Sequence, residues 1–133
     1  SAAAAEGIGA AASAAGVTVH LQIDLDSGFG RCGVPAGNAA AQIALARLIA
    51  DLPGVELDGV TTHRGLFFPG AAEMSREVAG AHEGQIVVAA AERLRAAGFE
   101  VREVTAGGSL TGAGVATVAT ATARAVCPGR RCR

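Results

Sequence analysis

The sequence predicts an α/β fold: a partial (β/α)8 barrel of the TIM type, with about three parallel strands alternating with helices. Helical and strand-type hydrophobic periodicity alternate along the chain, and the predicted strands are centred about forty residues apart, as in β-α-β units. Each predicted strand also ends in a polar or glycine-rich cluster. A complete flavodoxin-like domain needs about five strands, and three alone leave faces and edges uncovered, so part of a larger barrel fits better.

The first half of the chain predicts a helix, a strand and a second helix. Residues 2–15 are almost all alanine, which favours a helix, and Gly16 suits its C-terminal end. Residues 17–25 alternate apolar and polar side chains, which is the period of a strand. Asn38 is a good N-cap for the next helix, which Pro53 stops. The apolar face of that helix consists of Leu45, Leu48, Ile49 and Leu52.

The second half predicts strand, helix and strand again. A short strand over residues 57–62 leads into a loop, and the pattern from 71 to 97 is helical. Gly80 and Gly84 are expected to split that helix into two pieces. The third strand covers residues 100–105 and opens onto a glycine-rich loop.

Composition restricts the class of protein. The chain has 133 residues, half of them hydrophobic, which predicts one small domain with a packed core. All eleven fixed cations are arginine, since the sequence contains no lysine, and the net charge of −1 argues against a nucleic-acid partner. No apolar run approaches the roughly 18 to 20 residues of a membrane span. We expect a cytoplasmic protein with three reduced cysteines, no membrane partner and no metal site within this chain.

The predicted site lies in the loops after the three strands, where α/β folds carry their chemistry. Arg31 follows the first strand and presents a fixed cation with five donors to a phenolate, carboxylate or phosphate. His63 ends the second strand and can donate, accept or stack on an aromatic ligand, or serve as a buried structural histidine. The run 107–112 offers backbone N–H groups and hydroxyls to a phosphate, or is an ordinary flexible loop.

The turn at residues 28–33 also matches G-x-G-x-x-G, the dinucleotide fingerprint. We interpret these glycines as residues that a tight turn requires, in preference to a dinucleotide-binding motif. The helix begins too far downstream, Asp24 and Asp26 would repel a pyrophosphate, and the second strand ends in Thr-Thr-His instead of a ribose-binding acid.

Three motifs in order resemble the fold-type III pyridoxal phosphate enzymes, whose N-terminal barrel is shared by alanine racemase, D-threonine aldolase and D-serine dehydratase. Residues 23–34, Ile-Asp-Leu-Asp-Ser-Gly-Phe-Gly-Arg-Cys-Gly-Val, are similar to the strand and G-x-G-R-x-G turn of the aldolase and dehydratase branch. Residues 57–65 resemble the next strand, which carries a His or Tyr near the cofactor ring. Residues 103–111 resemble the phosphate-binding V-S-x-G-S-T-P-T, with Leu110 in place of proline and Gly108 in place of serine.

The resemblance covers residues 16–117 and implies a pyridoxal 5′-phosphate site. Arg31 and His63 would lie near the pyridine ring or its hydroxyl. The phosphate would be held by Gly107, Gly108, Ser109 and Thr111. The family also requires a Schiff-base lysine, which this chain lacks, so no catalytic residue is assigned and any divalent metal ligands of the parent protein are expected elsewhere.

The resulting expectation is a fragment of a pyridoxal phosphate-dependent D-amino acid lyase, like D-threonine aldolase or D-serine dehydratase, that supplies part of the cofactor pocket and is inactive alone. Residues 1–117 would form the partial barrel, and residues 118–133 an irregular, truncated or frame-shifted tail. Its partners would be a D-amino acid substrate and a second subunit in a homodimer. The alternatives are a non-catalytic barrel that binds pyridoxal phosphate or another phosphate ester, an alanine racemase-type isomerase, and a remnant without a stable fold.

Overall fold

The computed structural model describes residues 1–66 and 68–118. Most of the predicted tail, residues 119–133, lies outside the described part. Residues 112–118 are helical, which the sequence did not predict. The other elements, in chain order, are α1 (Ala2–Ala15), β1 (Val19–Asp26), β2 (Val34–Pro35), α2 (Ala39–Asp51), β3 (Val55–Thr62), the short 3-10 helix η1 (Ala71–Glu73), α3 (Arg76–Ala96) and β4 (Glu103–Ala106).

The strands form one parallel sheet in the order β2-β1-β3-β4. Ile23 in β1 pairs with Val60 in β3, which pairs with Val104 in β4. The three longer strands are the three predicted ones, shifted by a few residues at their ends, so the α/β class with alternating helices is confirmed. β2 was missed because two residues carry no readable periodicity.

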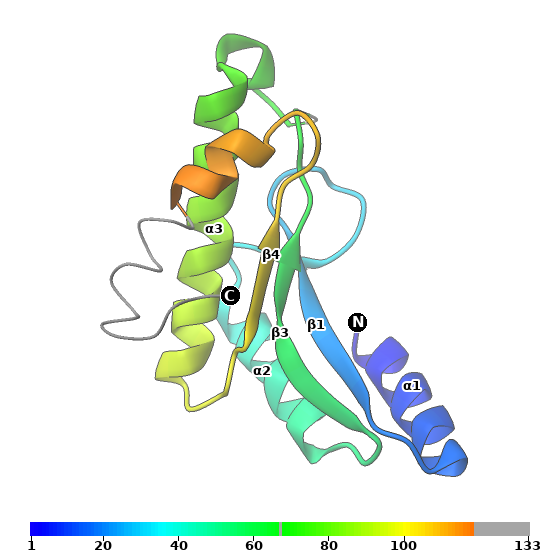
Figure 1. Ribbon diagram of the computed structural model, residues 1–133. Helices are drawn as coiled ribbons and strands as arrows, with labels where there is room; N and C mark the ends of the chain where they lie inside the picture. Colours follow the sequence, from blue (N-terminus) through cyan, green and yellow to red (C-terminus); the bar gives the residue numbers. More distant parts are fainter. Residues whose placement is uncertain (67, 119–133) are drawn as a thin grey trace.

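Alternation along β1 separates the two faces of the sheet. Ile23 and Leu25 are buried against the helices, together with Val60 of β3 and with Ala46, Ile49, Val87, Ala90, Ala91 and Leu94 of α2 and α3. In Figure 1 the strands β1, β3 and β4 lie side by side, with α1, α2 and α3 packed around them. The hydrophobic core therefore lies between the sheet and its helices.

The opposite face of the sheet is polar. His20, Glu56 and Arg102 meet there near the N-terminal ends of the strands. The Arg102 guanidinium lies 2.8 Å from an Asp58 oxygen and 3.5 Å from a Glu56 oxygen. Its contact with Asp58 raises the pKa of Arg102. These ion pairs are solvent-exposed, so each contributes little to stability.

The ends of the first two helices agree with the sequence prediction. Gly16 ends α1 with φ 66°, in the left-handed region that favours glycine. Asn38 caps α2, and its Oδ1 accepts the N–H of Ala41 at 3.0 Å. Both caps are local signals, which is why the sequence alone locates them.

The expectation that glycines split the third helix was wrong. The break lies earlier, between η1 and Ser75, whose hydroxyl caps α3 by accepting the N–H of Val78. From Arg76 onward the helix runs unbroken through Gly80 and Gly84. A Cβ on Gly80 would strike the Thr111 carbonyl oxygen, so the missing side chain lets the 112–118 helix pack closely on α3 (Figure 1). Glycine is needed here for close packing between helices and causes no break.

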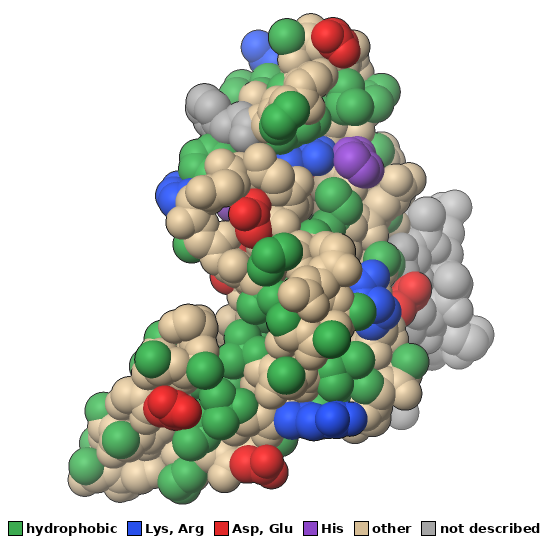
Figure 2. Space-filling model, turned by 180° about the vertical axis from the view of Figure 1, so that it is seen from behind, with side chains coloured by type: hydrophobic (Ala, Val, Ile, Leu, Met, Phe, Trp, Pro, Cys, Tyr) green, Lys and Arg blue, Asp and Glu red, His purple; other side chains and the backbone are tan. Residues whose placement is uncertain are grey.

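The helices show no membrane-spanning feature within the described residues. No helix within the described ranges is both long enough and apolar enough to cross a bilayer. Seen from behind, acidic and basic side chains are scattered over the surface and hydrophobic side chains gather over α1 and its neighbourhood (Figure 2).

Candidate functional site

Three loops meet at the C-terminal end of the sheet. They follow β1, β3 and β4, which are parallel neighbours, so their C-terminal ends lie on the same edge. Figure 1 shows these loops together at the upper end of the strands. The sequence predicted polar clusters in all three loops, and the topology brings them together.

The loop after β1 is a tight turn organised by Asp26. Its Oδ1 accepts the N–H groups of Gly28 at 2.9 Å and Gly30 at 3.0 Å. These bonds, that of Gly30 most strongly, hold the pKa of Asp26 below its ordinary value. Gly33 closes the turn at φ 99°, where a Cβ would lie 2.7 Å from the Asp26 nitrogen. The geometry supports the interpretation of these glycines as turn residues.

Arg31 lies on this turn over the ring of Phe29. Its guanidinium carbon is 4.7 Å from the centroid of the Phe29 ring, which in turn is 6.4 Å from the His63 ring. Arg31 and His63 line one small hollow, with Asp24, Leu25, Asp26, Phe29 and Cys32. The structure therefore brings two of the predicted site residues together, although they are far apart in the sequence.

His63 also contacts the glycine-rich loop after β4. Its Nδ1 is 3.3 Å from the carbonyl oxygen of Gly107, and a Cβ on Gly108 would lie 2.9 Å from its Cε1. His63 is exposed, which argues against the alternative of a buried structural histidine. Glycine at 108 lets the imidazole and the loop approach each other closely.

The predicted phosphate loop is folded back on itself. Gly107 has φ 94°, and the Gly108 carbonyl accepts the N–H groups of Thr111 at 3.1 Å and Gly112 at 2.8 Å. Ser109 is exposed at the tip. Thr111 is fully buried, and its hydroxyl donates to Glu83 Oε2 at 2.9 Å. Both donors of Thr111 are thus engaged inside the protein.

Arg64, next to His63 in the sequence, is buried and does not line the hollow shared by Arg31 and His63. It is 2% exposed, donates to the Ala79 carbonyl at 2.9 Å and lies with its guanidinium carbon 3.7 Å from the Phe68 ring centroid. Burial lowers the pKa of Arg64, and the nearby Glu83 opposes that shift. Arg64 therefore belongs to the packing between β3 and α3.

Glu83 is a residue that sequence reasoning missed. It is completely buried, and its Oε1 accepts a hydrogen bond from the backbone N–H of Arg64 at 2.7 Å. The available signal was its spacing: Glu83 shares the buried face of α3 with Ala79, Val87 and Ala90. A carboxylate on an apolar helix face marks a buried polar contact.

The donors at this site suit an aromatic phosphate ligand. A guanidinium, an imidazole, an exposed hydroxyl and glycine N–H groups lie at one edge of the sheet. These groups fit the phosphate and ring hydroxyl of pyridoxal phosphate, but the sequence contains no lysine to bond its aldehyde. Within the described ranges, no three His, Cys, Asp or Glu side chains form a group that could hold a metal ion.

Comparisons with known proteins identify the family to which this chain belongs. The model of the "Alanine racemase, N-terminal domain" family matches residues 1–128. D-threonine aldolase from Arthrobacter sp is 30% identical over 95 residues, which are 71% of this chain and 24% of that protein. The chain thus spans about a quarter of the length of this relative.

Solved structures show the same fold. D-threo-3-hydroxyaspartate dehydratase from Delftia sp. HT23 superposes with a TM-score of 0.71 at 32% identity, over 84% of this chain and 29% of that one. Alanine racemase from Clostridium difficile 630 gives a TM-score of 0.60 at 23% identity, over 83% and 27%, and supports the fold alone. Because the family model extends over nearly the whole sequence, the chain belongs to the alanine racemase N-terminal domain family of fold-type III pyridoxal phosphate enzymes.

Proposed function

We propose that this chain forms part of the pyridoxal phosphate pocket of a D-amino acid lyase, of the kind represented by D-threonine aldolase and D-serine dehydratase. The observation that carries the proposal is the meeting of Arg31, His63 and the 107–109 loop at one edge of the sheet. Similarity to a D-threonine aldolase and a D-threo-3-hydroxyaspartate dehydratase supports the lyase class over a racemase-type isomerase.

Each group has a distinct part in the proposed pocket. N–H groups of Gly107 and Gly108 and the Ser109 hydroxyl would donate to the phosphate. Arg31 would donate to the ring hydroxyl, and the exposed imidazole of His63 would contact the ring. Thr111 would support the loop from behind, through its bond to Glu83. When bound, the cofactor supplies an electron sink for the carbanion chemistry of amino acids.

The absence of lysine from the sequence affects the lyase activity that this chain can have alone. Without it the chain has no internal side-chain amine to bond the cofactor aldehyde, so we expect no lyase activity from the chain alone. The same observation favours a second candidate, a non-catalytic barrel that binds pyridoxal phosphate or another phosphate ester. A D-amino acid substrate, a homodimer and a cytoplasmic location remain parts of the proposal for the parent protein.

Calorimetry tests the pocket. Wild-type chain should release or absorb heat on titration with pyridoxal phosphate. Arg31→Ala and Ser109→Ala should each weaken binding about tenfold, the effect of losing one hydrogen bond to a charged group. Ser13→Ala changes an exposed serine on α1 and should leave the affinity unchanged. No heat with either pyridoxal phosphate or inorganic phosphate would remove the proposal.

Borohydride trapping tests whether any internal side chain bonds the cofactor aldehyde. After incubation with pyridoxal phosphate and reduction, mass spectrometry of peptides should find no reduced adduct on an internal side chain, because no lysine is present. An internal adduct would contradict this. Retention of lyase activity by the chain alone would contradict the expected inactivity.

A further inference from the structure

We propose that Glu83 is a positioning residue, which holds the glycine-rich loop against the strand end that carries His63. The inference rests on the proposed function, because it concerns the same pocket. Glu83 lies on α3, behind the loops, and does not face the hollow shared by Arg31 and His63. Its role would be to fix the distance between the imidazole and the phosphate-binding N–H groups.

The burial of Glu83 requires specific partners. The residue is 0% exposed, and a buried carboxylate is costly unless both oxygens are hydrogen-bonded. Oε1 accepts the Arg64 N–H at 2.7 Å, and Oε2 accepts the Thr111 hydroxyl at 2.9 Å. One donor follows β3 and the other follows β4. A single side chain thus joins two of the three loops of the site.

Both donors are directly coupled to predicted ligand groups. Arg64 is the residue after His63, so its anchored backbone N–H limits the movement of the imidazole. The Thr111 N–H donates to the Gly108 carbonyl at 3.1 Å, which ties the anchored threonine to the loop. His63 Nδ1 in turn lies 3.3 Å from the Gly107 carbonyl. If either anchor is released, the loop and the ring can move apart.

The surroundings of Glu83 supply compensating charge. The Arg64 guanidinium is buried nearby, where it contacts the Ala79 carbonyl and, at 3.2 Å, the His82 Nδ1. The attraction between Arg64 and Glu83 opposes the effect of burial on the arginine. Removing Glu83 would therefore disturb Arg64 as well, so a test should also use the partner on the loop.

Thr111 supplies that test. Thr111→Val keeps the shape and removes the donor to Glu83, whereas Thr111→Ser keeps the hydroxyl. In the ligand-free chain, NMR should show a shifted His63 Cε1–H signal and about tenfold faster exchange of the Gly112 amide in the valine variant. The serine variant should resemble wild type. Leu94→Ala is the control, because Leu94 lies in α3 like Glu83 but belongs to the hydrophobic core away from the loops. It should lower the melting temperature without moving the His63 signal.

Ligand binding extends the test. Thr111→Val should weaken the binding of pyridoxal phosphate and of inorganic phosphate about tenfold, and should weaken the binding of pyridoxal, which lacks the phosphate, less than that. In a Glu83→Ala background the valine change should have no further effect, because the bond is already absent.

The outcomes separate this inference from the proposed function. Unchanged His63 and Gly112 signals in Thr111→Val, or equal effects of valine and serine, would overturn the role of Glu83. If the valine variant does not fold while the serine variant does, Thr111→Ala, which also removes the hydroxyl donor but leaves Glu83 and Arg64 in place, provides the same His63 comparison. If wild type binds no phosphate ligand but the NMR signals respond as expected, the proposed function fails and the positioning by Glu83 stands.

Discussion

Asp26 shows how one side chain shapes the turn that carries Arg31. A single carboxylate oxygen accepts both the Gly28 and the Gly30 N–H groups, so the five residues from 26 to 30 are held as one compact turn. The negative charge strengthens these bonds, which is why the pKa of Asp26 is lowered. Because the folded pKa lies below the unfolded value, Asp26 stabilises the fold above about pH 4, and this contribution is lost as pH falls through the folded pKa.

Asp26→Asn should reveal this contribution. The amide oxygen can keep both bonds, so the variant removes mainly the charge. We expect a loss of less than about 1 kcal/mol in the free energy of unfolding at pH 7, since the carboxylate is largely solvated. The difference should shrink as the pH falls below about 4 and vanish once the pH lies below the lowered pKa of folded Asp26. Urea unfolding across this pH range measures it, and a difference that persists in acid would show that charge is not the cause.

At the scale of elements, Gly80 and Gly7 both lie in helices but have opposite environments. Gly80, in α3, faces the Thr111 carbonyl so closely that a Cβ cannot fit, and Gly114 in the 112–118 helix is equally crowded by the Glu77 carbonyl. Gly7, in α1, has nothing within 4 Å of its would-be Cβ. Alanine is the better helix former by about 1 kcal/mol at both positions, so only packing separates them.

Gly80→Ala and Gly7→Ala form a matched pair. Gly80→Ala should destabilise the chain by about 1 to 3 kcal/mol, because the added methyl pushes the 112–118 helix away from α3. Gly7→Ala should stabilise it by up to about 1 kcal/mol. Thermal unfolding followed by circular dichroism distinguishes the two. Equal stabilisation by both changes would mean that the two helices do not pack as described.

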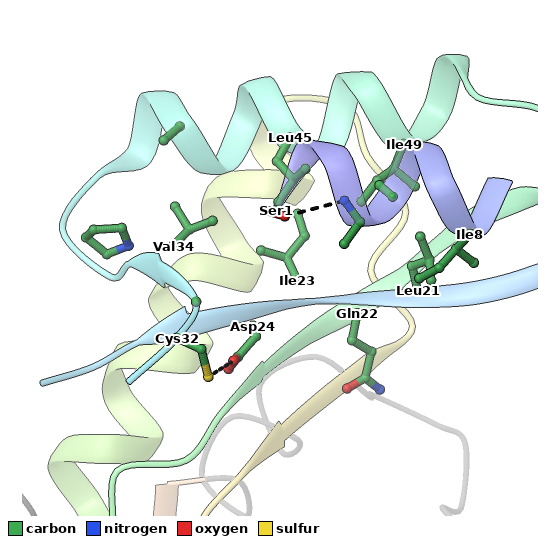
Figure 3. Close-up of a pocket in the computed structure, with 15 residues that line it drawn as sticks. Ser1, Ile8, Leu21, Gln22, Ile23, Asp24, Cys32, Val34, Leu45 and Ile49 are labelled. Atoms are coloured by element: carbon green, nitrogen blue, oxygen red, sulfur yellow. Dashed lines mark hydrogen bonds between the residues drawn. The ribbon is translucent and has the colours of Figure 1, made fainter. Parts of the chain in front are cut away.

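At the scale of the whole molecule, the helical layer is incompletely filled. A pocket of about 700 Å³ lies between α1, α2 and β1. Figure 3 shows Leu45 and Ile49 pointing toward Ile23 across this space, while Gln22 lies on the other side of the strand. The small side chains of α1 explain the pocket, since alanine forms the helix well but does not fill the space beneath it.

Ala4→Leu should fill part of this pocket. Ala4 lines it, and burying added methylene groups contributes about 1 kcal/mol, so the free energy of unfolding should rise by about that amount. Ala10→Leu on the same helix is the control, because Ala10 is exposed like Ala4 but does not line the pocket, and it should change stability by less than about 0.5 kcal/mol. Urea unfolding of both variants measures the difference. A gain from Ala10→Leu as large as that from Ala4→Leu would assign the effect to helix propensity.

The sequence by itself determined the elements with local signals and the edge of the sheet where the site lies. Strand alternation and the caps Gly16 and Asn38 depend on neighbouring residues only, so they could be read directly. The placing of Arg31, His63 and the 107–112 loop on one edge follows from parallel β-α-β topology, which fixes where strand ends lie. Their roles toward a cofactor stay predictions.

Tertiary structure decided what depends on residues distant in the chain. The low helix propensity of glycine predicts a break at Gly80. In the structure the helix is unbroken there, and the missing side chain allows close contact with the Thr111 carbonyl. In the sequence Glu83 has no local feature that distinguishes it from an exposed glutamate. In the structure it is buried between Arg64, 19 residues before it, and Thr111, 28 residues after it. Hydrogen bonds and steric contacts act over a few ångströms in space, so only the folded chain shows which residues they join.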